Sequence, residues 1–302
     1  MWQTCYEEVI LKILPASAFS IEELTHAYNQ TRLDYIVPMP LTAARLQEYI
    51  TVYDVDLDAS CAVVDEVEDL IVGIGMLGVR EDRTWITRLG VVPYGRRLGA
   101  GRALMDYLFD KTRALEVSDL WLEVIAGNEP AHRLFTKMGF LQTRELIVSR
   151  RPPSPLEPSP AVEQITHTRV LDTEEIFEHL RNRKLKPNWL NEIETFYHIP
   201  SLGGLFVNLQ NGCGWVVYES SMIQLKRVIV EVLEGDEAAV TEAILHTLHT
   251  RLPLVDAVSE NIPSTDPCWA GYEAVGYFDT FRRIEMVRPM HDNGCQVGSG
   301  AP

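Results

Sequence analysis

A short segment rich in glycine and arginine has the residue types and spacing that can bind a phosphate. Residues 91–102 read V-V-P-Y-G-R-R-L-G-A-G-R, between a strand-like and a helix-like stretch. Glycines let a ligand approach the backbone, and the first amides of a helix lack acceptors within it, so they can bind oxyanions. Arg96, Arg97 and Arg102 add positive charge. The segment predicts a diphosphate site at the start of a helix.

The segment allows two other interpretations, a Rossmann fingerprint and an ordinary glycine-rich turn. A Rossmann fingerprint needs a third glycine, where this chain has Leu104, and it needs parallel βαβ units, whereas the preceding strands follow hairpin patterns. The dinucleotide interpretation is therefore rejected. An ordinary glycine-rich turn stays open on the motif alone, because short motifs often match by chance.

The elements that must position this segment follow from apolar periodicity. Polar breaks at residues 65–69 and 80–83 offer hairpin turns between β-branched stretches, so the sequence predicts an α+β fold, mixed but with a mostly antiparallel sheet. Leu98, Leu104 and Leu108 are expected on the apolar stripe of one helix. Strands are expected at residues 9–14, 61–64, 70–79, 84–92, 120–125 and 140–148, and helices at 21–31, 42–53, 98–116 and 130–138.

The second half repeats this order loosely, which suggests a divergent internal duplication. Helices are expected at residues 173–183, 188–197, 237–250 and 269–275, and strands at 204–209, 214–218, 225–232, 255–259 and 277–286. A proline-rich stretch separates the halves, and prolines there are expected to continue neither helix nor sheet. The predicted organisation is a first domain at 1–151, an extended linker at 152–163, a second domain at 164–290 and a disordered tail at 291–302.

Linked motifs in the first 150 residues resemble the GNAT superfamily of N-acetyltransferases. The run from Arg96 to Gly101 resembles the family's Q/R-x-x-G-x-G/A loop, and Val91 and Pro93 match its V-x-P lead-in. Downstream the family's L-x-V, N-x-x-A and G-F patterns are matched by Leu122, Glu123, Val124, Asn128, Ala131, Phe135, Gly139 and Phe140. The resemblance implies a GNAT fold in two tandem copies, with the second copy degenerate.

The resemblance also implies an activity and a binding site. A GNAT enzyme takes acetyl-CoA as co-substrate and transfers the acetyl group directly to a primary amine of a small molecule or peptide, within a ternary complex. The fourth and fifth strands would part to admit pantetheine, and the thioester carbonyl would lie against an amide near Leu89 or Gly90. The implied cofactor-binding residues are Leu89, Gly90, Val91, Arg96, Arg97, Leu98, Gly99, Ala100, Gly101, Arg102, Asn128, Ala131 and Phe135.

Acyl transfer to an amine needs proton transfers. A lysine-like ammonium, with a pKa of about 10.4, must lose a proton before it attacks. Glu123, on the expected fifth strand, is the candidate base, and an exposed structural carboxylate is the alternative. Many family members carry a tyrosine where this chain has Phe135, so the leaving thiolate lacks that donor. Tyr94 or Tyr53 could replace it, although tyrosines near clefts more often serve packing.

The second copy lacks the cradle. Residues 230–238 read V-E-V-L-E-G-D-E-A, with carboxylates where the first copy has arginines, so this half is predicted to bind no CoA. Tyr272 resembles the tyrosine missing from the first half, with a core aromatic as the favoured interpretation. The competing hypothesis for the whole chain is a non-catalytic acyl-CoA sensor or scaffold.

Composition limits the partners. The 302 residues carry a net charge of −16, from 43 acidic and 27 basic side chains, which disfavours nucleic acid and anionic membranes and steers cations toward the protein. The five cysteines are scattered and no Cys or His pair has convincing metal-ligand spacing, so no metal is expected. With neither a signal peptide nor a long apolar run, the sequence predicts a cytoplasmic protein.

Overall fold

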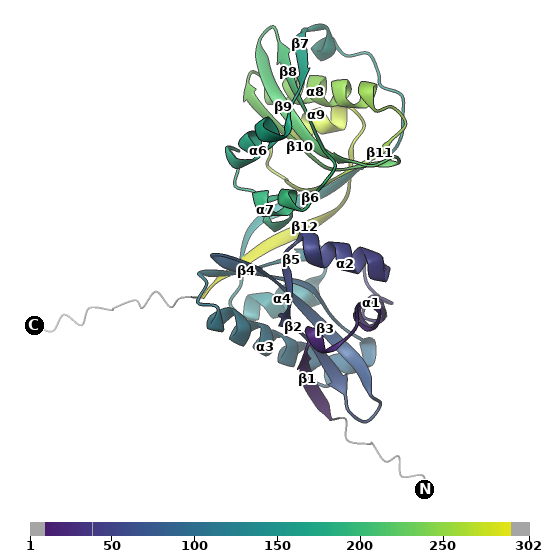
Figure 1. Cartoon of the computed structure of the whole chain (residues 1–302), viewed down its shortest axis with the longest axis vertical. Coiled ribbons are helices and arrows are strands. Elements are labelled where there is room, and N and C mark those ends of the chain that lie inside the picture. The colour runs from purple at the N-terminus through teal and green to yellow at the C-terminus, as the bar shows by residue number, and fades with distance from the viewer. Residues whose placement is uncertain (1–9, 38, 291–302) are drawn as a thin grey trace, which may run out of the picture. The chain divides into compact units, whose positions relative to one another are not determined.

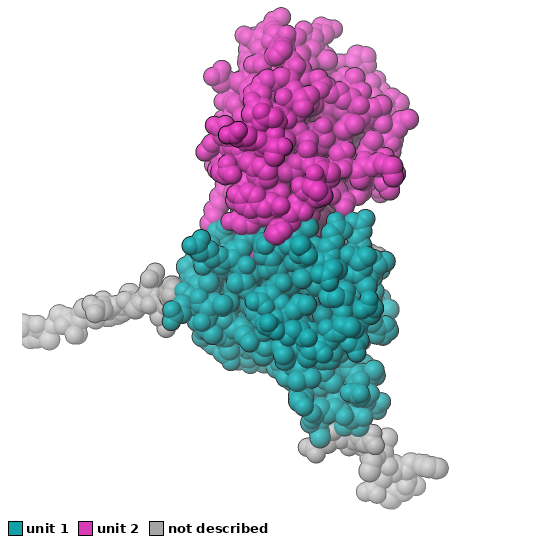
Figure 2. Space-filling model, in the orientation of Figure 1, with its two compact units in different colours: residues 1–123, 130–141, 286–302 teal, residues 124–129, 142–285 magenta. Residues whose placement is uncertain are grey.

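The computed structural model describes residues 10–37 and 39–290, which form two compact units (Figure 2). Unit 1 contains the chain up to Glu123, residues 130–141 and the chain from Met286. Unit 2 contains residues 124–129 and 142–285. These units are defined by contacts and are interrupted in sequence. The sequence-based domains at 1–151 and 164–290 therefore remain a prediction about the two copies, and the predicted tail at 291–302 lies outside the described residues.

Unit 1 is built on a sheet with the strand order β1-β2-β3-β4-β5 (Figure 1). Neighbouring strands pair in antiparallel fashion except β4 and β5, which are parallel. Both hairpin turns predicted from the polar breaks are present, at residues 66–69 and 81–82. The strands are β1 (Leu11–Pro15), β2 (Val55–Asp65), β3 (Leu70–Arg80), β4 (Arg83–Val91) and β5 (Asp119–Ile125).

Two helices of unit 1 begin at residues that cap them. Ser20 forms a capping box with Glu23 at the start of α1, and Thr42 caps α2. Leu104 and Leu108 of α3 are fully buried, as predicted. Leu98 is not on this stripe, because Gly99 adopts φ +86° and starts the helix after it, so Leu98 is 40% exposed. The helices are α1 (Ile21–Gln30), α2 (Ala43–Val52), α3 (Ala100–Ala114) and α4 (Glu129–Lys137), with 3-10 turns η1 (Ala16–Ala18) and η2 (Pro93–Arg97).

Unit 2 has the strand order β6-β11-β10-β9-β8-β7, and β10 and β11 form its parallel pair. Its main core lies between these strands and α8 (Glu237–Arg251), whose Ile244 and Leu248 are fully buried. The other elements are β6 (Leu141–Arg151), α5 (Pro160–Glu163), β7 (Ile165–Val170), α6 (Thr173–Arg181), η3 (Trp189–Asn191), α7 (Ile193–Tyr197), β8 (Leu202–Leu209), β9 (Gly212–Ser220), β10 (Gln224–Glu234), β11 (Asp256–Pro263), α9 (Trp269–Ala274) and β12 (Phe278–Pro289).

Two expectations for this half were wrong. Pro160 begins α5 instead of extending the linker, because proline is tolerated at the first helical position and Ser159 caps the helix. The helix expected at 188–197 is broken at Glu192, whose ψ of 160° is extended, so a 3-10 turn and the short α7 replace it.

No helix in the described part of the chain is long and apolar enough to cross a membrane.

Candidate functional site

In unit 1 the parallel strands β4 and β5 part within the sheet. They pair over four positions, from Arg83 with Asp119 to Ile86 with Leu122. Beyond Leu122 no further β4–β5 pair occurs in the described chain, so Thr87 on β4 and Glu123 on β5 are the first residues past the fork. An opened strand edge of this kind offers backbone donors and acceptors to an extended ligand.

A β-bulge marks β4 at the fork. Thr87 pairs with Met76 and Gly90 pairs with Ile74, so Arg88 and Leu89 lie opposite a single residue of β3. Arg88 has a φ of +50°, which is uncommon for a residue with a side chain. A Cβ on Gly90 would lie 2.4 Å from Oγ1 of Thr31. Glycine is needed here because the end of α1 packs against the strand.

The predicted phosphate cradle begins α3. Gly99 adopts φ +86°, and the first helical bond runs from the amide of Ala103 to its carbonyl. The amides of Ala100, Gly101 and Arg102 come before this first bond and have no acceptor within the helix. In the described residues no side chain caps this end of α3. The cradle therefore keeps the open amide end that an anion would need.

Two of the three arginines that were predicted to bind phosphate form ion pairs with carboxylates of the chain. Arg96 forms a two-point ion pair with Asp34, with N–O distances of 2.6 Å, and donates to the carbonyl of Val91. This pairing lowers the pKa of the Asp34 carboxyl through the hydrogen bond from Arg96. Arg102 pairs with Asp106 on the exposed face of α3. Arg97 lies in η2. Two predicted phosphate-binding side chains thus already contact carboxylates.

The two predicted catalytic residues occupy different environments. Glu123 is half-buried at the fork, the position expected for a base. Tyr94 lies in η2 and is 55% exposed; partial burial, with Asp65 and Glu68 nearby, raises the pKa of its hydroxyl. Tyr53 is buried and its ring packs edge-on against Tyr49 and Trp85, which favours the packing interpretation for Tyr53.

The remaining predicted residues lie on α4 or directly before it. Phe135 is buried and packs edge-on against Phe140. Ala131 lies half-buried on the same helix, and Asn128 stands in the turn before it, its amide donating to the carbonyl of Ile125. Phe135 thus supplies a buried ring and no proton.

Unit 2 contains a second fork of the same construction. Its strands β10 and β11 pair only at Gln224 with Asp256 and Leu225 with Ala257. The bulge recurs, because Lys226 pairs with Glu219 and Ile229 with Val217. By this register Arg227, with a φ of +49°, is the counterpart of Arg88. Val258 is the first residue of β11 after its last pair with β10, as Glu123 is the first residue of β5 after its last pair with β4. Val258 is therefore the counterpart of Glu123, and the second copy lacks the candidate base.

The second helix start is closed to anions. Asp236 caps α8, its Oδ1 accepting from the amide of Ala239 at 2.9 Å. A carboxylate therefore occupies the position where a phosphate would have to bind. This difference supports the prediction that the second copy binds no CoA, and it is the structural counterpart of the acidic sequence at 230–238.

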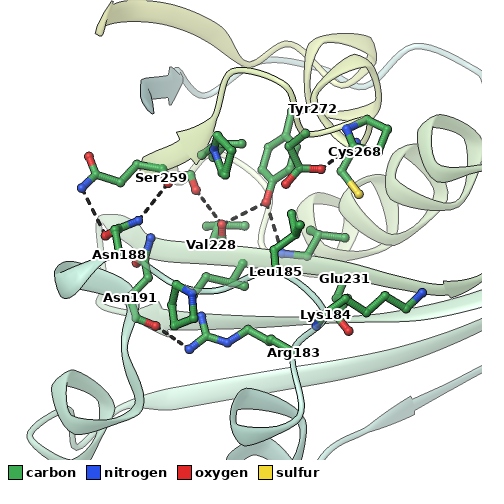
Figure 3. Close-up of a pocket in the computed structure, with 18 of the residues that line it drawn as sticks. Arg183, Lys184, Leu185, Asn188, Asn191, Val228, Glu231, Ser259, Cys268 and Tyr272 are labelled. Atoms are coloured by element: carbon green, nitrogen blue, oxygen red, sulfur yellow. Dashed lines mark hydrogen bonds between the residues drawn. The ribbon is translucent and has the colours of Figure 1, made fainter. Parts of the chain in front are cut away.

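Tyr272 closes the strand edge at the second fork (Figure 3). Its hydroxyl donates to the carbonyl of Val228 at 3.1 Å and accepts from the amide of Val230 at 3.2 Å. Tyr272 is the counterpart of Phe135, since in both copies the amide five residues later bonds back to this residue's carbonyl at 3.1 Å. A phenyl ring cannot make these bonds, so this closure is specific to the second copy.

A cavity of about 280 Å³ remains beside Tyr272. Lys184 lines one side and donates from Nζ to the carbonyl of Val232. Arg183 lines it too, and burial lowers the pKa of its guanidinium to about 10. The β10 edge is therefore bonded to side chains at several points.

In the described residues no group of three His, Cys, Asp or Glu side chains could hold a metal ion.

Sequence reasoning missed residues on the other side of β4. Arg32 follows α1 and donates from Nη2 to the carbonyl of Leu89 at 3.0 Å. Arg88 donates from Nη1 to the hydroxyl of Tyr28 at 3.0 Å and lies 3.9 Å from the ring centroid of Tyr49. No motif marks these positions, and their proximity depends on the packing of α1 and α2 against the bulge.

Comparisons with known proteins agree with this geometry. Residues 22–140 match the model of the acetyltransferase (GNAT) family. The [ribosomal protein bS18]-alanine N-acetyltransferase of Escherichia coli (strain K12) is 39% identical over 59 residues, which are 20% of this chain and 40% of that protein. The chain thus spans 40% of the length of this curated relative.

Solved structures extend the likeness over both units. A GCN5-related N-acetyltransferase from Sphaerobacter thermophilus superposes with a TM-score of 0.68 at 12% identity, covering 93% of this chain and 96% of that one. A tandem GNAT protein from the clavulanic acid biosynthesis pathway gives 0.62 at 14% identity, covering 94% and 99%. Residues 22–140 thus match the acetyltransferase (GNAT) family model, and the fold of the chain is that of the solved tandem GNAT protein.

Proposed function

We propose that unit 1 is an N-acetyltransferase that moves an acetyl group from acetyl-CoA to a primary amine of a small molecule or peptide. The amine attacks directly while both substrates are bound. The observation that carries this proposal is the fork at Thr87 and Glu123, in the same unit as a helix start with open amides at Ala100 and Gly101.

The helix start of the first copy fits the coenzyme and that of the second copy does not. The uncapped start of α3 accepts a diphosphate, whereas Asp236 fills the start of α8. We assign the cradle to residues 97–102 and the strand edge to residues 89–91. Arg96 shapes this edge, because it joins Val91 to Asp34. Asn128, Ala131 and Phe135 are assigned to the α4 side of the coenzyme site.

Residues of unit 1 are proposed to transfer the protons of the reaction and to stabilise the negative charge that develops on the carbonyl oxygen. Acetyl-CoA supplies the activated acyl group. Glu123 accepts the proton of the ammonium, directly or through a water molecule, so that a neutral amine can attack. An amide near Leu89 or Gly90 donates to the carbonyl oxygen where negative charge grows. Tyr94 is the candidate donor to the departing thiolate, and water is the alternative.

The names of the relatives suggest one acceptor class. The matched Escherichia coli protein is named for an alanine of a ribosomal protein, so a peptide amine belongs among the acceptors to be tested. We also propose a cytoplasmic location, in keeping with the free thiols of Cys61, Cys213 and Cys268.

Release of CoA thiol from acetyl-CoA, measured across a panel of small amines and peptides, tests the proposal. At least one amine should accelerate release in proportion to its concentration, and mass spectrometry should find the acetylated amine. If acetyl-CoA binds and no amine of either class accelerates release, the competing role of acyl-CoA sensor or scaffold replaces the enzyme.

A further inference from the structure

The cavity at the second fork has lining residues from both faces of the sheet of unit 2. Cys268 belongs to the core on the α8 face, and Ile229 packs against the core beside α6. Figure 3 shows Arg183, Lys184 and Glu231 on the side away from Cys268. A ligand in this cavity can therefore meet groups from both faces.

Charged side chains of both signs line the cavity. Besides Arg183, Lys184 and Glu231 they include Asp266, whose Oδ1 accepts from the amide of Cys268 at 2.9 Å. We call these four charged residues, two basic and two acidic, the charged wall. The lining as a whole contains four basic and four acidic side chains, so its formal charge is zero.

The charged wall is bonded to the backbone and not to other charges. Arg183 donates to the carbonyls of Leu180 and Asn191, and the carboxylate of Glu231 accepts from the amide of Lys184 at 3.2 Å. Within residues 10–37 and 39–290, no ion pair joins a member of the charged wall to another charged side chain. Both signs of charge thus face one cavity without neutralising each other by direct contact.

Burial disfavours the charged forms of three of these groups. It lowers the pKa of the Arg183 guanidinium to about 10 and raises the pKa values of the Glu231 and Asp266 carboxyls. Hydrogen bonds within the protein therefore replace only part of the hydration that these charges lose. A ligand with matching charges would compensate for the rest.

The remaining wall limits the size and polarity of the ligand. The cavity, of about 280 Å³, is near the small end of ligand pockets, which hold about 300–1,000 Å³. Leu185, Val228, Val230 and Ile262 contribute apolar residues to it. The hydroxyl of Tyr272 already occupies the β10 edge, so the ligand is held by side chains and not by that edge.

We infer that this cavity binds a small zwitterion, an amino acid whose carbon chain is apolar. Its carboxylate meets the guanidinium of Arg183, because guanidinium donors match the planar pair of carboxylate oxygens. Its ammonium meets the carboxylate of Asp266. A lining without net charge suits a ligand without net charge. This binding site is independent of the acetyl transfer proposed for unit 1.

Two isomeric amino acids test the inference. L-Leucine and 6-aminohexanoic acid have the same atoms and differ in the separation of their charges. Titrated calorimetrically into the wild-type chain without acetyl-CoA, at least one should bind, at one equivalent per chain. The primary amide and the N-acetyl derivative of the tighter ligand each lack one charge, and glycine lacks the apolar chain. Each of these three should bind about tenfold or more weakly. No binding of either isomer, or equal affinity for the ligand, its amide and its N-acetyl derivative, overturns the inference.

Variants locate the ligand. Arg183→Gln should weaken the amino acid about tenfold and leave its amide unaffected, whereas Asp266→Asn should weaken it equally and leave the N-acetyl derivative unaffected. Arg181→Gln, at the exposed end of α6, is the matched control and should keep the wild-type affinity. If Arg183→Gln does not fold, Asp266→Asn still decides, because its amide oxygen can accept from Cys268. Affinity kept in Asp266→Asn, or lost in Glu123→Gln of unit 1, would place the ligand elsewhere and overturn the inference.

Discussion

Glu123 owes its candidate role to its place in the strand ladder. It is the first residue of β5 beyond the last pair with β4, and the second copy has Val258 at the corresponding position. Its carboxylate is therefore carried by the first residue beside the backbone edge that the two strands leave unpaired. The loss of this group from the copy with the closed fork is consistent with a chemical role in the open one.

Glu123→Gln tests that role without changing the shape of the side chain. We expect kcat to fall about 100-fold near neutral pH, because positioned proton transfer contributes roughly that much or more. The acidic limb of the rate profile should move to higher pH, since only amine already neutral in solution can react. Rates measured from pH 6 to 10 give the answer, and a profile of unchanged shape would remove Glu123 from the mechanism.

His249 gives unit 2 a predictable response to acid. Burial lowers its pKa to about 3, and its Nε2 lies 3.1 Å from the hydroxyl of Tyr277. As the pH falls below about 6.5, this histidine is protonated in the unfolded chain and stays neutral in the folded chain. The free energy of unfolding therefore decreases as the pH falls from about 6.5 to about 3. Urea midpoints between pH 7 and 5 should fall more steeply for the wild-type chain than for His249→Gln. The exposed His167→Gln should follow the wild type, and equal slopes in all three would contradict the assignment.

At the scale of elements, the contrast between two helix starts carries most of the argument. Both α3 and α8 have 15 residues and follow the parted strand of their copy, yet one begins with Gly99 and the other with an aspartate cap. A cap stabilises a helix by about 1 kcal/mol. The first copy forgoes that contribution, which leaves its amides available.

Gly99→Ala should separate the coenzyme site from general stability. At φ +86° an added Cβ costs about 1–2 kcal/mol, although no atom lies within 4 Å of it. We expect a lower unfolding midpoint and an affinity for CoA at least tenfold weaker, because the helix start must shift. Gly276→Ala, at φ +95° and with only ordinary contacts, is the matched control. It should lose similar stability and keep its affinity, so equal affinity losses in both variants would argue against the cradle.

The sequence was most informative where a pattern depends on nearby residues. Strand alternation and the hairpin breaks predicted most strands, and glycine spacing predicted the uncapped helix start of the first copy, whose role as a phosphate site stays a prediction. The sequence did not reveal β7, a strand at a sheet edge in which none of the six residues is buried. It also did not reveal α5, since Ser159 and Pro160 look like linker in isolation. The ion pair of Arg96 with Asp34 joins positions 62 apart, which no local pattern reveals.

For the whole molecule, the two copies predict a single coenzyme site. The first fork has an uncapped helix start, whereas in the second Asp236 and Tyr272 occupy the helix amides and the strand edge. Calorimetric titration should find one equivalent of CoA per chain. In Gly99→Ala this one site should bind CoA at least tenfold more weakly. Two equivalents, or one that survives Gly99→Ala unchanged, would contradict the assignment of the sites.

The interrupted make-up of unit 1 has a consequence for its synthesis. Residues 286–290, at the end of β12 and just beyond, belong to unit 1, and the amide of Met290 donates to the carbonyl of Ser118 at 2.9 Å. A ribosome must therefore translate all of unit 2 before it delivers the last piece of unit 1. Until then, unit 1 lacks its last segment and cannot complete its fold. A nascent chain arrested before residue 286 should therefore be more sensitive to protease in residues 10–123 than the finished protein.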